Sequence, residues 1–245
     1  MVSEEKGLPD SFEVRKFRSG TEEIDPATTR NVRWVAKLGS QAYGNPVVSG
    51  GKVFIGTNNE SPRDPNVKGD RGILLCLDEK TGKLLWQLAV PKLGTGKISD
   101  WEFLGICSSP AVEGNRLYVV TNRCEVLCLD ANGLADGNQG PFMEEAQYKA
   151  GPGQPPAPLG PMDADIIWRF DLREELGVFP HNANACSILV VGNKLITATA
   201  NGVDNGHTTV PAPRRSRSTS AACFRRATRR STRSTTSQPT CWPRR

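Results

Sequence analysis

Three copies of a two-strand motif constrain the fold of this chain more than any other feature of its sequence. Each copy contains two apolar runs separated by Gly-Gly or Gly-Asn, and the copies occupy residues 45–57, 109–121 and 187–199. Aligned on the first glycine of that link, all three copies end without a gap in threonine: Thr57, Thr121 and Thr199. A unit that recurs along a chain usually packs against copies of itself. The repetition therefore predicts a fold built from stacked, similar units.

The link in each copy predicts a tight β-hairpin. Gly and Asn accept the positive φ that two-residue type I′ and II′ turns require, and these turns match the twist of the flanking strands. In the first copy Val53 and Ile55 face one way and Phe54 faces the other. Apolar residues on both faces are typical of a strand that is covered on both sides.

Two further runs extend the motif to four strands. Residues 73–78 and 126–130 end in Leu-Asp, and a run containing tryptophan lies at 84–87, 32–34 and 166–168. Asp78 and Gly82 flank the link to the fourth run and favour a turn with Asx-type bonding. Four short antiparallel strands per unit describe a propeller blade. We therefore predict an all-β fold: a partial β-propeller of about three four-stranded antiparallel blades.

The segment 77–86 carries the pattern L-D-x-x-T-G-K-x-x-W and resembles the signature of pyrroloquinoline-quinone-like (PQQ-like) repeat β-propellers. Over residues 31–210 the chain is most similar to uncharacterised periplasmic propellers of planctomycete-type bacteria. The resemblance implies a structural repeat motif made of Asp78, Thr81, Gly82, Trp86, Asp130 and Trp168. It also implies an exported or periplasmic protein. The family includes quinoprotein dehydrogenases and outer-membrane assembly lipoproteins, so the resemblance alone does not define an activity.

Charge divides the chain into two unlike parts. Residues 211–245 contain ten Arg and no Lys, Asp or Glu. Subtracting these ten from the 31 Lys+Arg of the whole chain leaves 21 basic residues before position 211, against 26 Asp+Glu, so the net charge there is −5. The segment 211–245 also lacks Leu, Ile and Val, and its composition predicts disorder.

Three interpretations of residues 211–245 remain open. A shifted reading frame in GC-rich DNA gives this Arg, Ser, Thr and Pro composition, and we favour it. A basic tail that binds nucleic acid or anionic lipid is the second, and an inert linker is the third. Such nucleic-acid tails usually carry Lys or stacking aromatics, and this one has only Phe224 and Trp242, so we predict no specific nucleic-acid partner.

The remaining boundaries follow from simple sequence criteria. Residues 1–30 are predicted to be an extended N-terminal segment, and residues 31–210 to form blades of an incomplete ring. The first residues show no apolar signal-peptide core, and no run of 18 apolar residues predicts a transmembrane segment. We interpret the chain as an excerpt of a longer propeller. Open blade faces and strand edges should then make it marginally stable or prone to association.

Candidate chemistry in the chain is sparse. The two histidines, His181 and His207, predict neither a histidine metal cluster nor a Ser-His-Asp triad. Cys76 and Cys128 occupy the same repeat slot and are predicted to be core residues. No metal site is predicted: the Asx- and Gly-rich segment 130–140 has a composition that calcium loops favour, but an ordinary turn is the simpler interpretation.

Two loop sites receive specific predictions. A Cys107–Cys124 disulfide is allowed in an oxidising compartment. Loops that precede the first strand of a blade lie at the rim or central channel of a propeller, where ligands bind. On that basis we predict a ligand-binding surface formed by Trp101, Glu102, His181 and Asn182.

We predict a non-catalytic binding or scaffolding propeller for a protein or glycan partner. The alternative is a fragment of a quinoprotein dehydrogenase, which the resemblance implies would hold PQQ and calcium with a vicinal cysteine pair and an aspartate base. The chain has no adjacent cysteines, which counts against this alternative. PQQ and calcium are therefore expected only in the context of a full-length family protein.

Overall fold

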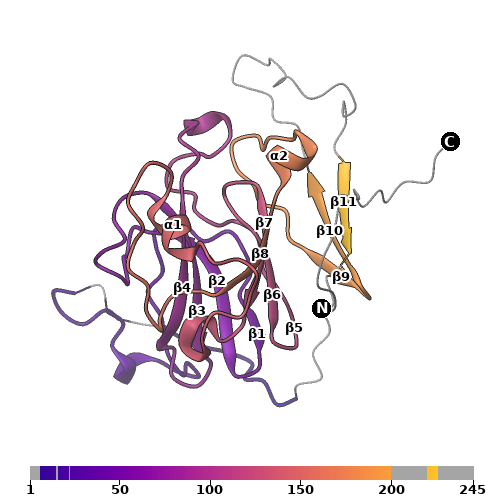
Figure 1. Cartoon of the computed structure of the whole chain (residues 1–245). Helices are drawn as coiled ribbons and strands as arrows, with labels where there is room; N and C mark the ends of the chain where they lie inside the picture. Colours follow the sequence, from indigo (N-terminus) through magenta and orange to yellow (C-terminus); the bar gives the residue numbers. More distant parts are fainter. Residues whose placement is uncertain (1–5, 15, 22, 200–219, 226–245) are drawn as a thin grey trace.

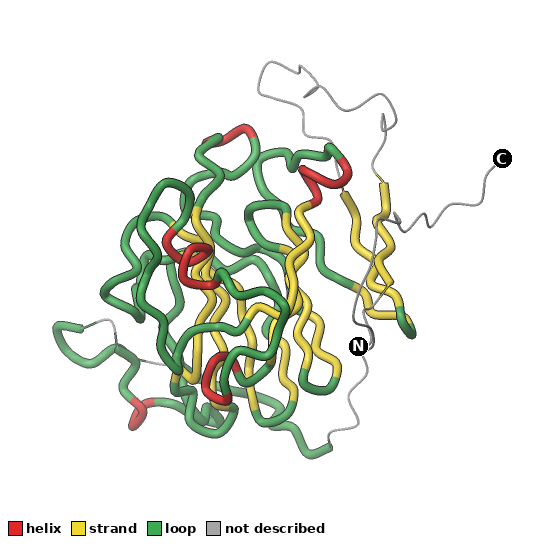
Figure 2. Tube along the Cα trace, in the orientation of Figure 1, coloured by secondary structure: helices red, strands yellow, loops and turns green. Residues whose placement is uncertain are grey.

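The computed structural model describes residues 6–14, 16–21, 23–199 and 220–225, and it consists mainly of three antiparallel sheets (Figures 1 and 2). The first sheet has the strand order β1 (Val47–Ser49), β2 (Lys52–Asn58), β3 (Arg71–Asp78), β4 (Leu84–Pro91). The second has the order β5 (Ala111–Glu113), β6 (Arg116–Val120), β7 (Glu125–Asp130), β8 (Ile166–Asp171). The third has the order β11 (Ser220–Arg225), β10 (Lys194–Thr199), β9 (Leu189–Val191).

Short helices lie before the first strand and in the connections between strands. They are the 3-10 helices η1 (Pro26–Thr28), η2 (Gly96–Ile98) and η3 (Gly133–Asp136), and the α-helices α1 (Glu145–Ala150) and α2 (Leu172–Leu176). None of the helices in the described ranges is long and apolar enough to cross a bilayer. Two complete four-stranded sheets in simple sequential order confirm the predicted fold class, a partial all-β propeller.

The three hairpins have the register that the repeat predicts. Their equivalent strand pairs are Val48 opposite Val53, Val112 opposite Leu117, and Val190 opposite Leu195. The first link residue in each has a positive φ: 59° at Gly50, 56° at Gly114 and 55° at Gly192. These values explain why glycine stands there in all three copies, since other residues strain in this region.

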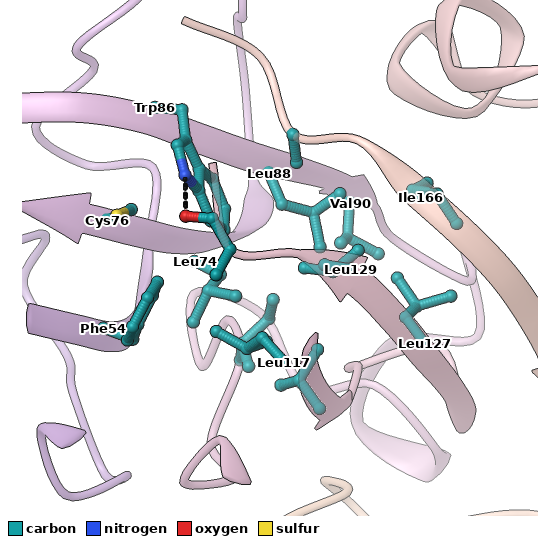
Figure 3. Close-up of a cluster of buried hydrophobic side chains, with 14 residues drawn as sticks. Phe54, Leu74, Cys76, Trp86, Leu88, Val90, Leu117, Leu127, Leu129 and Ile166 are labelled. Carbon is teal, nitrogen blue, oxygen red and sulfur yellow. Dashed lines mark hydrogen bonds between the residues drawn. The ribbon is translucent and has the colours of Figure 1, made fainter. Parts of the chain in front are cut away.

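The hydrophobic core lies between neighbouring sheets. One buried cluster joins the first sheet to the second and includes Phe54, Leu74, Trp86, Leu117 and Leu129 (Figure 3). A second cluster joins the second sheet to the third and includes Tyr118, Val126, Cys128, Ile188 and Leu195. The first and second sheets thus bury apolar side chains on both faces, as the double-sided pattern of their strands predicts.

Trp34 and Trp86 each reach forward onto the sheet that follows them in the chain. Trp86 Nε1 donates a hydrogen bond of 3.0 Å to the Ala131 carbonyl, which is drawn in Figure 3. Trp34 Nε1 donates one of 2.8 Å to the Glu79 carbonyl. Both acceptors directly follow the Asp of a Leu-Asp strand end, so the two contacts are equivalent in the repeat.

The motif residues around Asp78 form the predicted turn. Asp78 Oδ1 accepts hydrogen bonds from the Thr81 hydroxyl at 2.7 Å, the Thr81 amide at 2.8 Å and the Lys80 amide at 3.1 Å. These bonds, led by that of the Thr81 side chain, lower the pKa of Asp78 below 3.8. Gly82 completes the turn with a φ of +69°.

Asp130 occupies the equivalent place in the second sheet with different partners. It accepts from Arg116 Nη1 at 2.6 Å, Asn115 Nδ2 at 2.8 Å and the Asn132 amide at 2.8 Å. Trp168 lies on β8 and packs against Tyr118, with ring centroids 6.2 Å apart. In both complete sheets the Asp of the motif therefore accepts the hydrogen bonds that hold the end of the third strand.

Two segments differ from the sequence prediction. Residues 32–34, expected to be a Trp-bearing strand, are not part of a sheet in the described structure, although their side chains alternate between exposed and half-buried. Within the predicted disordered tail, residues 220–225 form β11, which pairs antiparallel with β10. The other tail residues, 211–219 and 226–245, lie outside the described part. Composition alone missed β11 because backbone pairing with an existing strand does not require aliphatic residues.

Candidate functional site

The four predicted surface residues come together where two connections meet. The Trp101 amide donates to the Asn182 carbonyl at 2.7 Å, and the Asn182 amide donates to the Ile98 carbonyl at 2.9 Å. These two backbone hydrogen bonds join the β4–β5 connection to the segment that precedes β9. Glu102 and His181 adjoin this junction in sequence, and both are exposed.

The buried carboxylate of Asp100 holds the backbone next to this junction through hydrogen bonds and an ion pair. Asp100 is almost fully buried and accepts a hydrogen bond of 2.8 Å from the Leu93 amide and one of 3.0 Å from Asn122 Nδ2. Lys92 Nζ lies 2.5 Å from Asp100 Oδ1 and donates to the Trp101 carbonyl at 2.7 Å. A buried charge paired and hydrogen-bonded in this way fixes the backbone that carries Trp101.

Around the backbone that Asp100 holds, three apolar side chains remain partly exposed to solvent. The exposed fractions are 39% for Trp101, 46% for Phe103 and 42% for Ile98. Lys97 Nζ lies 5.2 Å from the centroid of the Trp101 ring, a cation–π contact. The surface therefore combines aromatic faces with the polar side chains of Glu102 and His181.

The backbone at this surface is held in an uncommon conformation. Phe103 and Asn182 both have a φ of 61°, a region that asparagine tolerates but that is an outlier for a bulky residue such as phenylalanine. The Phe103 amide donates to Asp70 Oδ2 at 2.8 Å, and the Phe103 carbonyl accepts from Asn58 Nδ2. These contacts compensate the strain and keep the Phe103 side chain at the surface.

Sequence reasoning missed the supporting residues of this site. Lys92, Asp70 and Asn122 come from three separate connections, and only the fold brings them to Asp100 and Phe103. Asp100 stands beside Trp101 in the sequence, but nothing in the sequence indicates that its carboxylate is buried. Asn182 shows a further feature that the sequence does not indicate: within the described part of the chain, its buried Oδ1 atom has no hydrogen-bond partner.

The predicted Cys107–Cys124 disulfide is not formed in the structure. Both residues are free, buried cysteines. The Cys107 thiol lies 3.6 Å from the Leu104 carbonyl, and Cys124 packs in the core between the second and third sheets. Burial raises the pKa of Cys107 to about 11 and that of Cys124 to about 12, so neither is a reactive thiolate.

Among the described residues, the acidic side chains do not gather into the set of oxygen ligands that calcium requires. In the part of the chain that the structure describes, no three His, Cys, Asp or Glu side chains are grouped so that they could hold a metal ion. Asp100, the buried carboxylate nearest the candidate surface, is already neutralised by Lys92. We therefore derive no chemical step through PQQ or calcium.

A partial all-β propeller built from repeated four-stranded sheets is the class of fold that this architecture defines. No protein-family model matches the chain, and no curated protein matches it. Among solved structures, BamB from Moraxella catarrhalis is similar at 14% identity and a TM-score of 0.33, over 71% of this chain and 37% of that one.

Two dehydrogenase structures are similar to a comparable degree. Quinohemoprotein alcohol dehydrogenase from Comamonas testosteroni shows 13% identity and a TM-score of 0.36, over 69% of this chain and 20% of that one. A europium-containing methanol dehydrogenase shows 12% identity and a TM-score of 0.38, over 72% and 26%. The chain thus spans well under two thirds of each of these structures.

Proposed function

We propose that the chain is a binding or scaffolding module that recognises a protein or glycan partner through the surface around Trp101. The observation that carries this proposal is an exposed aromatic pair, Trp101 and Phe103, on a backbone held by the buried Asp100–Lys92 pair. Aromatic side chains supply large contact areas at binding sites, and a rigid platform reduces the ordering cost of association. Glu102 and His181 supply hydrogen-bonding groups at the rim.

The unusual φ of Phe103 supports the same proposal. Strained residues persist where the surroundings over-determine them, and they cluster at ligand-binding positions. An exported location, as the family resemblance implies, remains a prediction.

Binding can be tested with two sets of probes, immobilised oligosaccharides and extended peptides, applied to the full chain. Trp101→Ala and Phe103→Ala should each weaken binding about 30-fold or more, because truncating a central aromatic contact costs about 2 kcal/mol. Tyr43→Ala is the matched control, since Tyr43 is an exposed aromatic residue of another connection.

Unchanged binding by Trp101→Ala would contradict the proposal. A separate assay addresses catalysis: dye reduction after addition of PQQ and calcium to the full chain should stay at background. Turnover in that assay would favour the quinoprotein dehydrogenase alternative instead.

A further inference from the structure

The stack of sheets is open at both ends in the described structure. We call the face of the first sheet that points away from the second sheet the near face. It carries the buried cluster Val53, Val67, Ile73, Leu75 and Leu77. The far face of the third sheet carries Leu189 and Ile196, which lie opposite each other on β9 and β10. The alternate residues Val190 and Leu195 pack toward the second sheet.

Each open face exposes an apolar residue whose repeat counterparts are packed. Val48 on β1 is 59% exposed, whereas its counterparts Val112 and Val190 pack against the clusters between sheets. Leu189 on β9 is 60% exposed, whereas its counterpart Ala111 packs against the cluster between the second and third sheets. Both exposed residues therefore occupy positions that the repeat buries wherever a neighbouring sheet is present.

The segment 32–38 packs on the near face but belongs to no sheet in the described structure. Its half-buried side chains Trp34, Ala36 and Leu38 pack on the near-face cluster. Trp34 makes the same contact with the Glu79 carbonyl that Trp86 of β4 makes with Ala131. By this equivalence the segment occupies the fourth-strand position, yet no strand in the described ranges pairs with it. A cleft of about 1480 Å³ opens beside it.

The third sheet lacks the kind of strand whose position the segment 32–38 occupies. Within the described residues it contains first, second and third strands but no fourth. In both complete sheets the fourth-strand Trp stands opposite a third-strand Cys: Trp86 opposite Cys76 and Trp168 opposite Cys128. Cys223 of β11 has the same register, because it pairs with Ile196 as Cys76 pairs with Phe54. The edge of β11 is therefore in register for a strand that contains tryptophan.

From these matching ends we infer that a second copy of this chain docks head to tail. The segment 32–38 of one copy adds to β11 of the other, with Trp34 opposite Cys223 of the second copy. The far face of that copy's third sheet then covers Val48 and the near face. Strand addition supplies main-chain hydrogen bonds, and burial of Val48 and Leu189 adds the apolar contribution. Two copies bring six sheets together, a number found in closed propellers.

The two open faces differ, so the interface is heterologous and a mixing experiment can identify it. The mass of the full chain in solution, measured by light scattering, should correspond to two copies. Val48→Glu or Leu189→Glu alone should weaken association at least about tenfold, because each places an unpaired charge in the interface. An equimolar mixture of the two variants should restore association, since one intact pair of faces remains.

Two controls distinguish loss of this interface from nonspecific association and from misfolding of the variants. Met143→Glu, at a residue that is 68% exposed elsewhere, should leave the mass unchanged. Circular dichroism should show folded variants, because Val48 and Leu189 are mostly exposed in the single copy. A one-copy mass for the unmodified chain overturns the inference. A mixture that stays as single copies also overturns it, since it indicates a different contact.

Discussion

Gly82 meets two independent requirements at one residue. Its φ is +69°, and a Cβ atom placed there would lie 2.6 Å from the Trp34 ring. Gly133 stands in the same relation to Trp86, with a φ of +64° and a distance of 2.8 Å. The sequence pattern predicts the turn at Gly82, but the requirement for space beneath an indole ring becomes apparent only from the structure.

Gly82→Ala should therefore be more costly than the same substitution at a glycine that lies in open space. Gly50 has a φ of +59°, and nothing lies within 4 Å of the position that a Cβ atom would take, so Gly50→Ala isolates the backbone cost of about 1–2 kcal/mol. Gly82→Ala should lose about 1–3 kcal/mol more from overpacking. Urea unfolding of the two variants measures the difference, and equal losses would show that Trp34 moves aside freely.

Asp165 is a buried carboxyl, and no cationic side chain in the described part of the chain forms an ion pair with it. Burial is the largest cause of its raised pKa of about 6, and the neighbouring Asp130 and Glu145 carboxylates raise it further. One oxygen accepts from the Gln139 amide at 2.9 Å, and the other has no hydrogen-bond partner. Because the folded state binds this proton more tightly than the unfolded state, the folded state loses stability as the pH rises from about 4 to about 6.

Asp165→Asn should remove this loss. The variant keeps an oxygen for the Gln139 amide but cannot ionise, so its free energy of unfolding at pH 8 should rise by up to about 3 kcal/mol. Near pH 4 the two proteins should differ little, since the wild-type carboxyl is then protonated when folded. Denaturant titrations at both pH values measure the change, and an equal effect at pH 4 and pH 8 would rule out ionisation as the cause.

At the scale of elements, hairpins and strands could be predicted because their determinants are local. Alternating apolar residues and a Gly-Gly or Gly-Asn link specify β1–β2 and β5–β6 without reference to the rest of the chain. The segment 32–38 shows the limit of this reasoning. It has the pattern of a strand, but a strand also needs a neighbour, and sequence alone does not supply one.

The residues that support the candidate site could not be predicted, because they meet only in the folded chain. Trp101 and His181 could be predicted from their place before a first strand, whereas Lys92 and Asn122 reach Asp100 only through the fold. Glu125 is a further example: it is fully buried and lies 3.0 Å from Arg169 Nη1 of the neighbouring strand β8. Charges that are distant in sequence reveal their pairing only in three dimensions.

The cysteines of the sheets provide a test of these elements. Burial raises the pKa of Cys76 and Cys128 to about 12, whereas Cys186 is only half-buried. Iodoacetamide at pH 8 should therefore modify Cys186 first among the five cysteines with described side chains, because thiolate and access are both required. Peptide mass spectrometry gives the order, and early labelling of Cys76 would indicate that the first sheet opens readily. Labelling of all five in denaturant is the control.

At the scale of the whole molecule, the segments outside the sheets differ in how firmly they are attached to the sheets. Residues 6–31, apart from those not described, are mostly exposed and are joined by two isolated bridges, Glu13–Arg30 and Phe17–Ile24. The insertion that carries α1 is attached more firmly, since Lys149 Nζ lies 2.9 Å from Asp64 and 2.8 Å from Asp163. The N-terminal segment and the α1 insertion should therefore differ in their contribution to stability.

Removal of residues 1–31 should change the free energy of unfolding by less than about 1 kcal/mol, because few buried contacts are lost. Trp34→Ala should lower it by about 2–3 kcal/mol, since the ring packs on Gly82 and bonds to the Glu79 carbonyl. Thermal and urea unfolding of both variants provide the measurement. A large loss on truncation would mean that the N-terminal segment is an integral part of the fold.

The forward reach of the tryptophans has a consequence for the order in which the chain folds during synthesis. Trp34 and Trp86 each bond to a carbonyl 45 residues further along the chain. During synthesis, each indole therefore cannot form this hydrogen bond until those 45 residues have emerged from the ribosome. At about 5–20 residues per second this delay lasts a few seconds. During these seconds the indole stays exposed on the nascent chain, where chaperones that bind apolar groups can contact it.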